Sequence, residues 1–314
     1  MLRARRRDEA TRSARPTRSA RSRRRREISV SYAMLLPSLL PYIAFAVLPI
    51  VWLVYYSFHR WNGFTEPTFV GLDNYERVLR DEQWWEAVVT TLQFTAGRLL
   101  IEVPVSLALA YVFFRGIRGG LVLRTVYFLP YVLSPAIIGI VFGYLLRQVG
   151  GPFNQILQGL HLIAAPVDFL GDATNALLSL IGVGVWAHLG INMLLFLAGM
   201  LTIPREFTES AAVEGAGEWA TFRYVVLPML MPVARIVILI SIIGILRSFD
   251  LVKTLTDGGP AGATEVMFTY LYRFFFNPEA IPQIGYAAAL GVSASVVVGV
   301  VSVAYLRLVR RQEA

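Results

Sequence analysis

The chain has 314 residues, of which 56% are hydrophobic and only 16% are charged. This small share of polar side chains cannot cover the surface of a soluble globule of this length. The composition therefore predicts a protein embedded in lipid. The sequence contains no cysteine, which excludes disulfides, iron–sulfur clusters, thiolate zinc sites and cysteine nucleophiles.

The first 27 residues differ in composition from the rest of the chain. Residues 1–27 hold twelve arginines and three acidic residues, whereas the remainder holds 17 basic and 18 acidic residues. The net charge of +8 therefore comes from this Arg-rich segment, which we predict to be a disordered cytoplasmic tail. Such a tail favours anchoring on the anionic inner leaflet of a membrane. Nucleic acid is not an expected partner, because no aromatic residue interleaves with the arginines.

Residues 28–314 are predicted to form one transmembrane domain of about six helices. A bilayer core about 30 Å thick needs roughly 20 mostly apolar residues for each crossing, and six segments meet that requirement. They lie near 33–57, 88–114, 125–146, 177–201, 229–250 and 286–306. The first segment is as long as a full span and no small-residue cleavage site follows it, so we expect it to remain as a helix.

Basic residues near the ends of the spans predict the orientation. With the N-terminus inside, twenty Lys and Arg residues lie in cytoplasmic segments and six lie on the opposite side. This bias predicts that both termini are cytoplasmic. The connections at 58–87, 147–176 and 251–285 are then outside the cell, and the long connection 202–228 is inside.

The connection 202–228 carries a helix pattern of its own. Thr202 as an N-cap, with Pro204 in the first turn, predicts the start of a helix, and Gly215 and Gly217 predict its end. The small side chains between these positions make a slim helix that can enter a groove on another protein. The composition alone favours the alternative, an ordinary amphipathic helix at the membrane interface.

The order of residues in this connection favours the first interpretation. Glu209-Ser210-Ala211 is followed by Glu214-Gly215-Ala216, and then by Phe222 and Leu227-Pro228 before the next span. This order resembles the EAA loop of ABC importer permeases, whose usual form is Glu-Ala-Ala, then Asp-Gly-Ala, then Phe and Leu-Pro. Ser210 and Glu214 are mild departures from that form.

The resemblance implies a binding-protein-dependent ABC permease fold and a mechanism of coupling. In such permeases the loop forms a coupling helix that docks in a cleft of a cytoplasmic ATP-binding subunit. It implies ATPase contacts for Glu209, Ser210, Ala211, Glu214, Gly215 and Ala216. The chain has no Gly-rich phosphate loop, so we expect no cofactor on this chain and no enzyme activity, with ATP and Mg²⁺ held by the partner ATPase.

A second resemblance narrows the branch of the family. It rests on Phe249-Asp250-Leu251-Val252, the run from Leu255 to Pro260, Thr264-Glu265, Tyr270-Leu271-Tyr272 and the run from Gly71 to Tyr75. These motifs look like the first permease of bacterial carbohydrate importers of the maltose or glycerol-3-phosphate type. The resemblance implies a multi-pass subunit of the bacterial inner (plasma) membrane that moves a sugar or sugar derivative. The implied partners are a second permease subunit, two ATP-binding subunits and an extracytoplasmic solute-binding protein.

Two other functions stay open as alternatives. One is a permease of the same superfamily that transports amino acids, peptides or polyamines. Only the second resemblance argues against it. The other is an ion-driven secondary transporter, which usually needs internal repeats or several unpaired intramembrane carboxylates; the sequence shows neither feature, which disfavours this alternative.

Four residues are candidates for the solute path. A sugar path needs polar groups for orientation and aromatic faces for stacking. By resemblance to the maltose permease, Tyr131 follows Leu-Pro, Trp186 keeps the Trp of an Asn-Leu-Trp-Leu-Gly run, and Ser241 keeps a Ser of the next span, whereas His188 departs from the pattern. These matches imply that the pocket is kept for a sugar other than maltose. Alternatively, Tyr131 and Trp186 are interfacial or packing aromatics, and Ser241 bonds the backbone of its own helix.

Charged residues inside the predicted spans are functional candidates by default. Glu102 lies near the centre of the second span, and Arg98 lies one turn earlier on the same face, so an internal pair is the alternative interpretation. Arg247 and Asp250 have a similar spacing at the end of the fifth span. They are candidates for gate or solute contacts, or for bonds to neighbouring helices.

Overall fold

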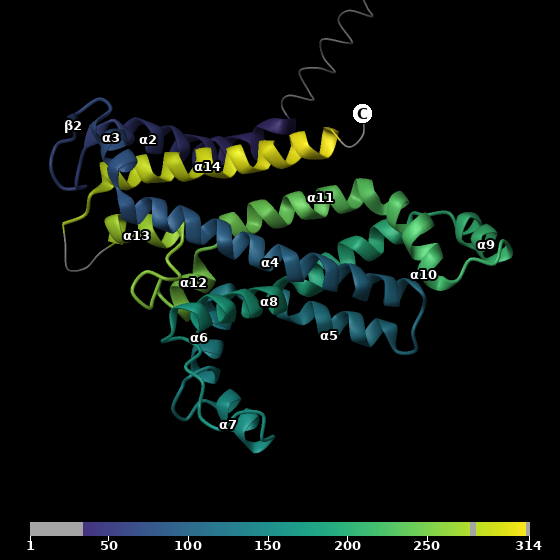
Figure 1. Cartoon of the computed structure of the whole chain (residues 1–314). Coiled ribbons are helices and arrows are strands. Elements are labelled where there is room, and N and C mark those ends of the chain that lie inside the picture. Colours follow the sequence, from purple (N-terminus) through teal and green to yellow (C-terminus); the bar gives the residue numbers. More distant parts are fainter. Residues whose placement is uncertain (1–33, 277–280, 312–314) are drawn as a thin grey trace, which may run out of the picture. The chain divides into compact units, whose positions relative to one another are not determined.

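The computed structural model describes residues 34–276 and 281–311 (Figure 1). The predicted Arg-rich tail, residues 1–27, lies outside the described residues. The described chain divides into two compact units, with the boundary between Tyr55 and Tyr56.

Helices dominate the described residues, which confirms the predicted all-α fold. Within the part of the chain that the structure describes, five helices are long and apolar enough to cross a membrane, and a sixth crossing results if a bent helix pair counts as one span. The five are Met34–Ser57, Glu82–Phe114 (α4), Ala173–Leu201 (α8), Glu218–Leu246 and Ile284–Arg311 (α14). The bent pair consists of α5 (Gly120–Val132) and α6 (Pro135–Leu145), which meet at 95°.

The first unit is helical throughout its described part. A π-helical turn, η1 (Ile43–Val47), is followed by α2 (Leu48–Ser57), which runs into the second unit. Nearly all large apolar side chains of this unit are left exposed by the rest of the chain. Exposure of this kind is expected for a helix whose surroundings are lipid.

The second unit begins with a short pair of strands and a helix. Strands β1 (His59–Arg60) and β2 (Thr68–Phe69) are antiparallel and precede α3 (Asp73–Arg80). Asp81 then caps α4, because its carboxylate accepts from the Trp84 backbone N–H at 3.2 Å. The same carboxylate accepts from the hydroxyls of Tyr270 and Tyr286, which lie on α13 (Met267–Phe276) and α14. One acidic residue thus joins three helices.

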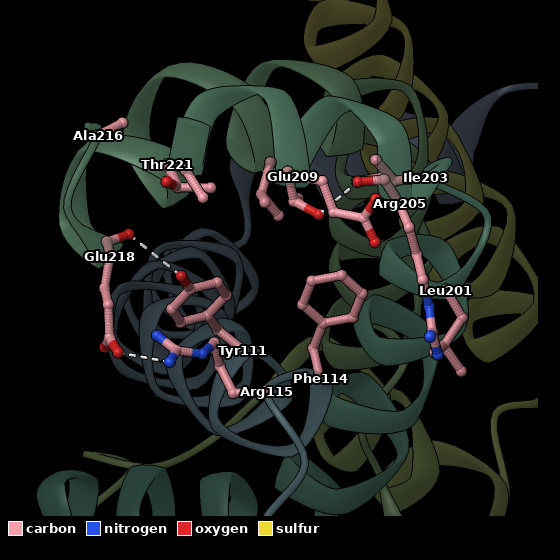
Figure 2. A pocket seen from close by; sticks show the side chains of 13 residues that line it. Tyr111, Phe114, Arg115, Leu201, Ile203, Arg205, Glu209, Ala216, Glu218 and Thr221 are labelled. Carbon is pink, nitrogen blue, oxygen red and sulfur yellow. Dashed lines mark hydrogen bonds and ion pairs between the residues drawn. The ribbon is translucent and has the colours of Figure 1, made fainter. Parts of the chain in front are cut away.

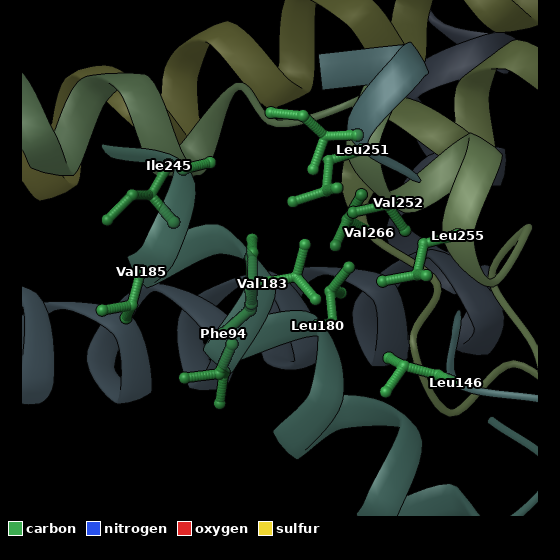
Figure 3. Close-up of a cluster of buried hydrophobic side chains, with 13 residues drawn as sticks. Phe94, Leu146, Leu180, Val183, Val185, Ile245, Leu251, Val252, Leu255 and Val266 are labelled. Carbon is green, nitrogen blue, oxygen red and sulfur yellow. The ribbon is translucent and has the colours of Figure 1, made fainter. Parts of the chain in front are cut away.

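The core of the second unit forms around α8, whose side chains are buried along most of its length. Figure 3 shows one cluster of buried apolar side chains, in which Phe94 of α4 meets residues of α8 and of α12 (Asp250–Leu255). A second cluster joins α4 and α8 to η2 (Phe222–Val226) and α11 (Leu227–Leu246). A third joins α3 and α4 to α13 and α14. Among the remaining helices, α7 (Pro152–Gly159) follows α6 in the chain.

Small residues permit close helix contacts in this core. A Cβ atom on Gly190 of α8 would lie 2.0 Å from the backbone oxygen of Tyr127 on α5. Similarly, a Cβ atom on Gly139 of α6 would lie 1.9 Å from the Thr254 hydroxyl on α12. Such contacts are typical of helix pairs in membranes, where packing replaces the hydrophobic effect as the source of association.

Candidate functional site

The connection between α8 and α11 contains two short helices, α9 (Arg205–Val213) and α10 (Glu218–Thr221), followed by η2. The predicted start of the first helix at Thr202 is wrong. Thr202 instead ends α8, where its hydroxyl donates to the Gly199 carbonyl at 2.8 Å. Pro204 explains the shift, because the residue before a proline is disfavoured in the helical conformation. The new helix therefore begins at Arg205.

The end of α9 has the geometry that the glycine predicts. Gly215 has a φ of +84°, a conformation that side chains with a Cβ rarely adopt. Its N–H donates to the Ala212 carbonyl at 3.1 Å, and the Ala216 N–H donates to the Ala211 carbonyl at 2.9 Å. These two bonds form a Schellman motif, which satisfies carbonyls that a helix end otherwise leaves unpaired.

Helix α9 has two different faces. One face, formed by Arg205, Thr208, Glu209 and Ala212, lines a cavity of about 580 Å³ (Figure 2). The opposite face carries Phe207, Ser210, Ala211 and Glu214, none of which lines the cavity. The six candidate coupling residues are therefore split: Glu209 and Ala216 line the cavity, and the other four do not. We call the face that carries Phe207, Ser210, Ala211 and Glu214 the outward face of α9.

The far wall of the cavity belongs to the end of α4, which is bonded directly to α10. Arg115 forms an ion pair with Glu218, and the Tyr111 hydroxyl donates to the Glu218 carbonyl at 3.1 Å (Figure 2). The hydrogen bond to Glu218 raises the pKa of the Arg115 guanidinium. The connection 202–228 is thus bonded to a helix outside its own two flanking spans.

The four solute-path candidates do not form one cluster. The rings of Tyr131 and His188 meet edge to face with centroids 5.7 Å apart, and His188 Nδ1 lies 3.2 Å from the Gly184 carbonyl. Trp186 instead packs against Phe142, with ring centroids 5.1 Å apart, beside an apolar pocket. Trp186 and His188 lie about 200° apart around α8, since each helix residue advances about 100°. The structure therefore brings Tyr131 and His188 together and separates Trp186 from them.

Ser241, the fourth candidate, is buried in a polar network. Its hydroxyl accepts from the Asn192 amide at 3.0 Å, and the same amide donates to Glu102 Oε1 at 2.6 Å. Arg98 donates to Glu102 Oε2 from Nη2 at 2.7 Å and from Nε at 3.0 Å. The Arg98–Glu102 pair that the i, i+4 spacing predicts is thus present. Asn192 bonds this pair directly, and Ser241 is joined to it through Asn192. We call Arg98, Glu102, Asn192 and Ser241 the Glu102 network.

Arg247 and Asp250 are both exposed, and within residues 34–276 and 281–311 no ion pair joins them. Arg247 follows the last turn of α11, and Asp250 begins α12. The same part of the chain has no group of three or more metal-ligating side chains that could hold a metal ion.

The segment after α12 contains the buried acidic residue Glu265. It is part of a motif shared with carbohydrate permeases, but the sequence predicted no role for it. Glu265 is buried and forms an ion pair with Arg273 of α13. Burial raises the pKa of the Glu265 carboxyl, against the opposing effects of Thr269 and Arg273. A Cβ atom on Gly258 would lie 2.7 Å from Glu265 Oε2, so the glycine leaves room for this carboxylate.

Sequence reasoning missed two sets of residues. Asn192 is an amide within an apolar span, and its type alone could have marked it, because amides in membranes bond across helices. Tyr111, Arg115 and Glu218 gave no comparable signal, since they contact one another only after α4 and α10 have met.

Comparisons with known proteins agree on one family. Residues 102–313 match the family described as the binding-protein-dependent transport system inner membrane component. The chain is 31% identical to the trehalose/maltose transport system permease protein MalF of Thermococcus litoralis, over 91% of this chain and 95% of the relative. It is 30% identical to the multiple sugar-binding transport system permease protein MsmF of Streptococcus mutans, over 90% and 96% respectively. A crystal structure of a bacterial ABC transporter that imports the polysaccharide alginate has a similar fold, with a TM-score of 0.77 at 24% identity over 91% of this chain and 96% of that chain.

Proposed function

Because the chain belongs to the family of binding-protein-dependent transport system inner membrane components, we propose that it is a permease subunit of an ATP-driven importer for a sugar or sugar derivative. The chain is a membrane transport subunit and not an enzyme. The observation that carries the proposed substrate class is the similarity, over nine-tenths of the chain, to relatives named as permeases for trehalose, maltose and multiple sugars.

The proposed assembly contains this chain, a second permease subunit, two ATP-binding subunits and an extracytoplasmic solute-binding protein. The need for a binding protein follows from the family itself. A fold neighbour is an alginate transporter described in complex with its periplasmic protein, which supports the same arrangement. The bias of basic residues supports an orientation with both termini and the connection 202–228 in the cytoplasm.

In the proposed mechanism, the outward face of α9 docks on an ATP-binding subunit. Phe207 supplies an exposed apolar anchor, Ser210 and Ala211 keep the helix slim, and Glu214 adds a charge. The opposite face of α9 remains directed at the cavity beside α4. Movement of the motor then displaces α9 and the two spans that flank it.

We assign the solute path to the surface that carries Tyr131 and His188. Tyr131 is 45% exposed within this chain, so its ring is available to a solute between this subunit and a second permease. An aromatic face and an imidazole together suit a sugar, which stacks its apolar face and bonds its hydroxyls. The Ser241 hydroxyl is less available to the solute, because it is buried and already accepts a hydrogen bond from Asn192.

The test is purification from the native membrane in mild detergent, identification of co-purifying subunits, and reconstitution in proteoliposomes. We expect an ATP-binding subunit and a second permease to be recovered, and the vesicles to take up a sugar when ATP and the loaded binding protein are supplied. Uptake of amino acids, peptides or polyamines in place of sugars would establish the alternative substrate class. Recovery of an active chain without partners would contradict the proposal.

A further inference from the structure

The Glu102 network links three spans. Glu102 of α4 accepts from Asn192 of α8, and Asn192 also donates to Ser241 of α11. All four side chains of the network are less than a tenth exposed. Since α8 and α11 are the two spans joined by the connection 202–228, the network links both spans that flank this connection to a third helix, α11 through Asn192 of α8.

We propose that Glu102 and Asn192 are positioning residues that make α4, α8 and α11 move as one body when the connection is displaced, an inference that rests on the proposed function. Apolar helix faces can slide past one another, because each lost contact is replaced by a similar one. A buried polar network cannot slide in this way. Each broken bond would leave an amide or a carboxylate unpaired in a medium of low dielectric constant.

The surroundings of the network fit a fixed register. A Cβ atom on Gly184 of α8 would lie 2.9 Å from Arg98 Cδ and 3.1 Å from Arg98 Nε, so the glycine gives the arginine its space between α4 and α8. Arg98 in turn neutralises Glu102, which would be costly as a lone buried charge. The neighbouring contacts of α11 with α4 and α8 are apolar. The network therefore supplies the directional contacts between these spans at this level.

The test compares Asn192→Leu with a matched control in the complete transporter. The control is Thr95→Val, because Thr95 is as buried as Asn192, at 5% exposure, but its hydroxyl bonds only the Thr91 carbonyl of its own helix. The readout is the amount of solute taken up per ATP hydrolysed in proteoliposomes with a loaded binding protein. In Asn192→Leu we expect this ratio to fall at least about fivefold while ATP hydrolysis persists. In the control we expect it to stay unchanged.

Ser241→Ala provides a second variant, which removes only the bond between α8 and α11 and decides the question if Asn192→Leu fails to assemble. The natural absence of cysteine also permits spin labels at Leu201→Cys and Met231→Cys, two exposed positions on α8 and α11. We expect the distribution of distances between the labels to broaden in either variant. A normal uptake ratio with an unchanged distribution would overturn the proposal, as would an equal loss in Thr95→Val. A wild-type complex without ATP-driven uptake would contradict the proposed function instead, and the label distances would still test the network.

Discussion

Gly215 combines a backbone role with a place in the proposed docking helix, and substitutions can separate the two. Its φ is +84°, and no heavy atom lies within 4 Å of the position that a Cβ atom would take there. Asparagine tolerates this backbone conformation better than other residues, whereas a β-branched residue adds about 1–2 kcal/mol of strain.

We therefore expect Gly215→Asn to leave thermal stability unchanged but to lower sugar uptake per ATP hydrolysed, because it adds bulk beside the docking face. Gly215→Val should lower both the uptake ratio and the melting temperature. Uptake and ATP hydrolysis in proteoliposomes, together with thermal unfolding in detergent, measure the two effects. Normal coupling in Gly215→Asn would mean that this end of α9 does not contact the motor.

The separation of Tyr131 and His188 from Trp186 gives a second prediction for single residues. His188→Leu removes the imidazole that faces the Tyr131 ring, and we expect the maximal uptake rate at saturating binding protein to fall about tenfold, the effect of about 1.4 kcal/mol. Trp186→Leu is the control on the same helix and should change that rate less than twofold. Equal effects of the two substitutions would argue against the assigned path.

At the scale of elements, the close contact of α5 with α8 depends on Gly190. Because a Cβ atom there would overlap the Tyr127 backbone, Gly190→Ala must push the two helices apart. We expect a loss of about 1–3 kcal/mol in stability, as for other overpacked cores. Gly182→Ala on the same helix is the control, since no atom lies within 4 Å of its Cβ position, and it should be neutral or stabilising. Melting temperatures of the purified variants test the difference.

The spacing of residues along one helix predicted a contact within that helix, but it did not predict the contact between helices. The pairing of Arg98 with Glu102 followed from their spacing on one helix, because i and i+4 side chains always share a face. The bond from Asn192 to Glu102 joins residues 90 positions apart and depends on how α8 is rotated against α4. No pattern within either helix specifies that rotation, so only the folded chain reveals the contact.

Proline shows the same limit in the third apolar segment. Residues 125–146 have the length of one span, but the structure bends between α5 and α6, just before Pro135. Pro130 lies inside α5 without interrupting it, and Pro104 lies inside α4. The presence of proline thus identifies places where a helix can break, while neighbouring helices decide which of them do. The EAA-type order in 202–228, by contrast, predicted a helix ended by glycine, and α9 ends in that way.

At the scale of the whole molecule, stability should depend on pH through Glu265. Its pKa is raised in the folded protein, so the folded state binds this proton more tightly than the unfolded state does. The corresponding contribution to stability is complete below the ordinary carboxyl pKa and is lost as the pH rises through the raised value.

We expect Glu265→Gln, which cannot ionise, to escape this loss. The melting temperature of the variant relative to the wild-type protein should therefore increase as the pH rises from about 4 toward neutrality. Thermal unfolding of both proteins in detergent across that range measures the trend. A difference that stays constant with pH, or that falls as the pH rises, would contradict the assignment.

The bend between α5 and α6 has a consequence for what a solute meets. Where one helix ends and another begins, the last carbonyls of the first and the first N–H groups of the second lack partners within their own helices. Ser134 makes no side-chain bond to cap α6, and Pro135 has no N–H to contribute. If the solute path lies beside Tyr131, as proposed, the chain there offers peptide acceptors and donors that bond hydroxyl groups whatever side chains surround them. On this proposal, a permease built on such a bend can change the sugar it accepts by altering nearby side chains, while the backbone groups of the bend stay the same.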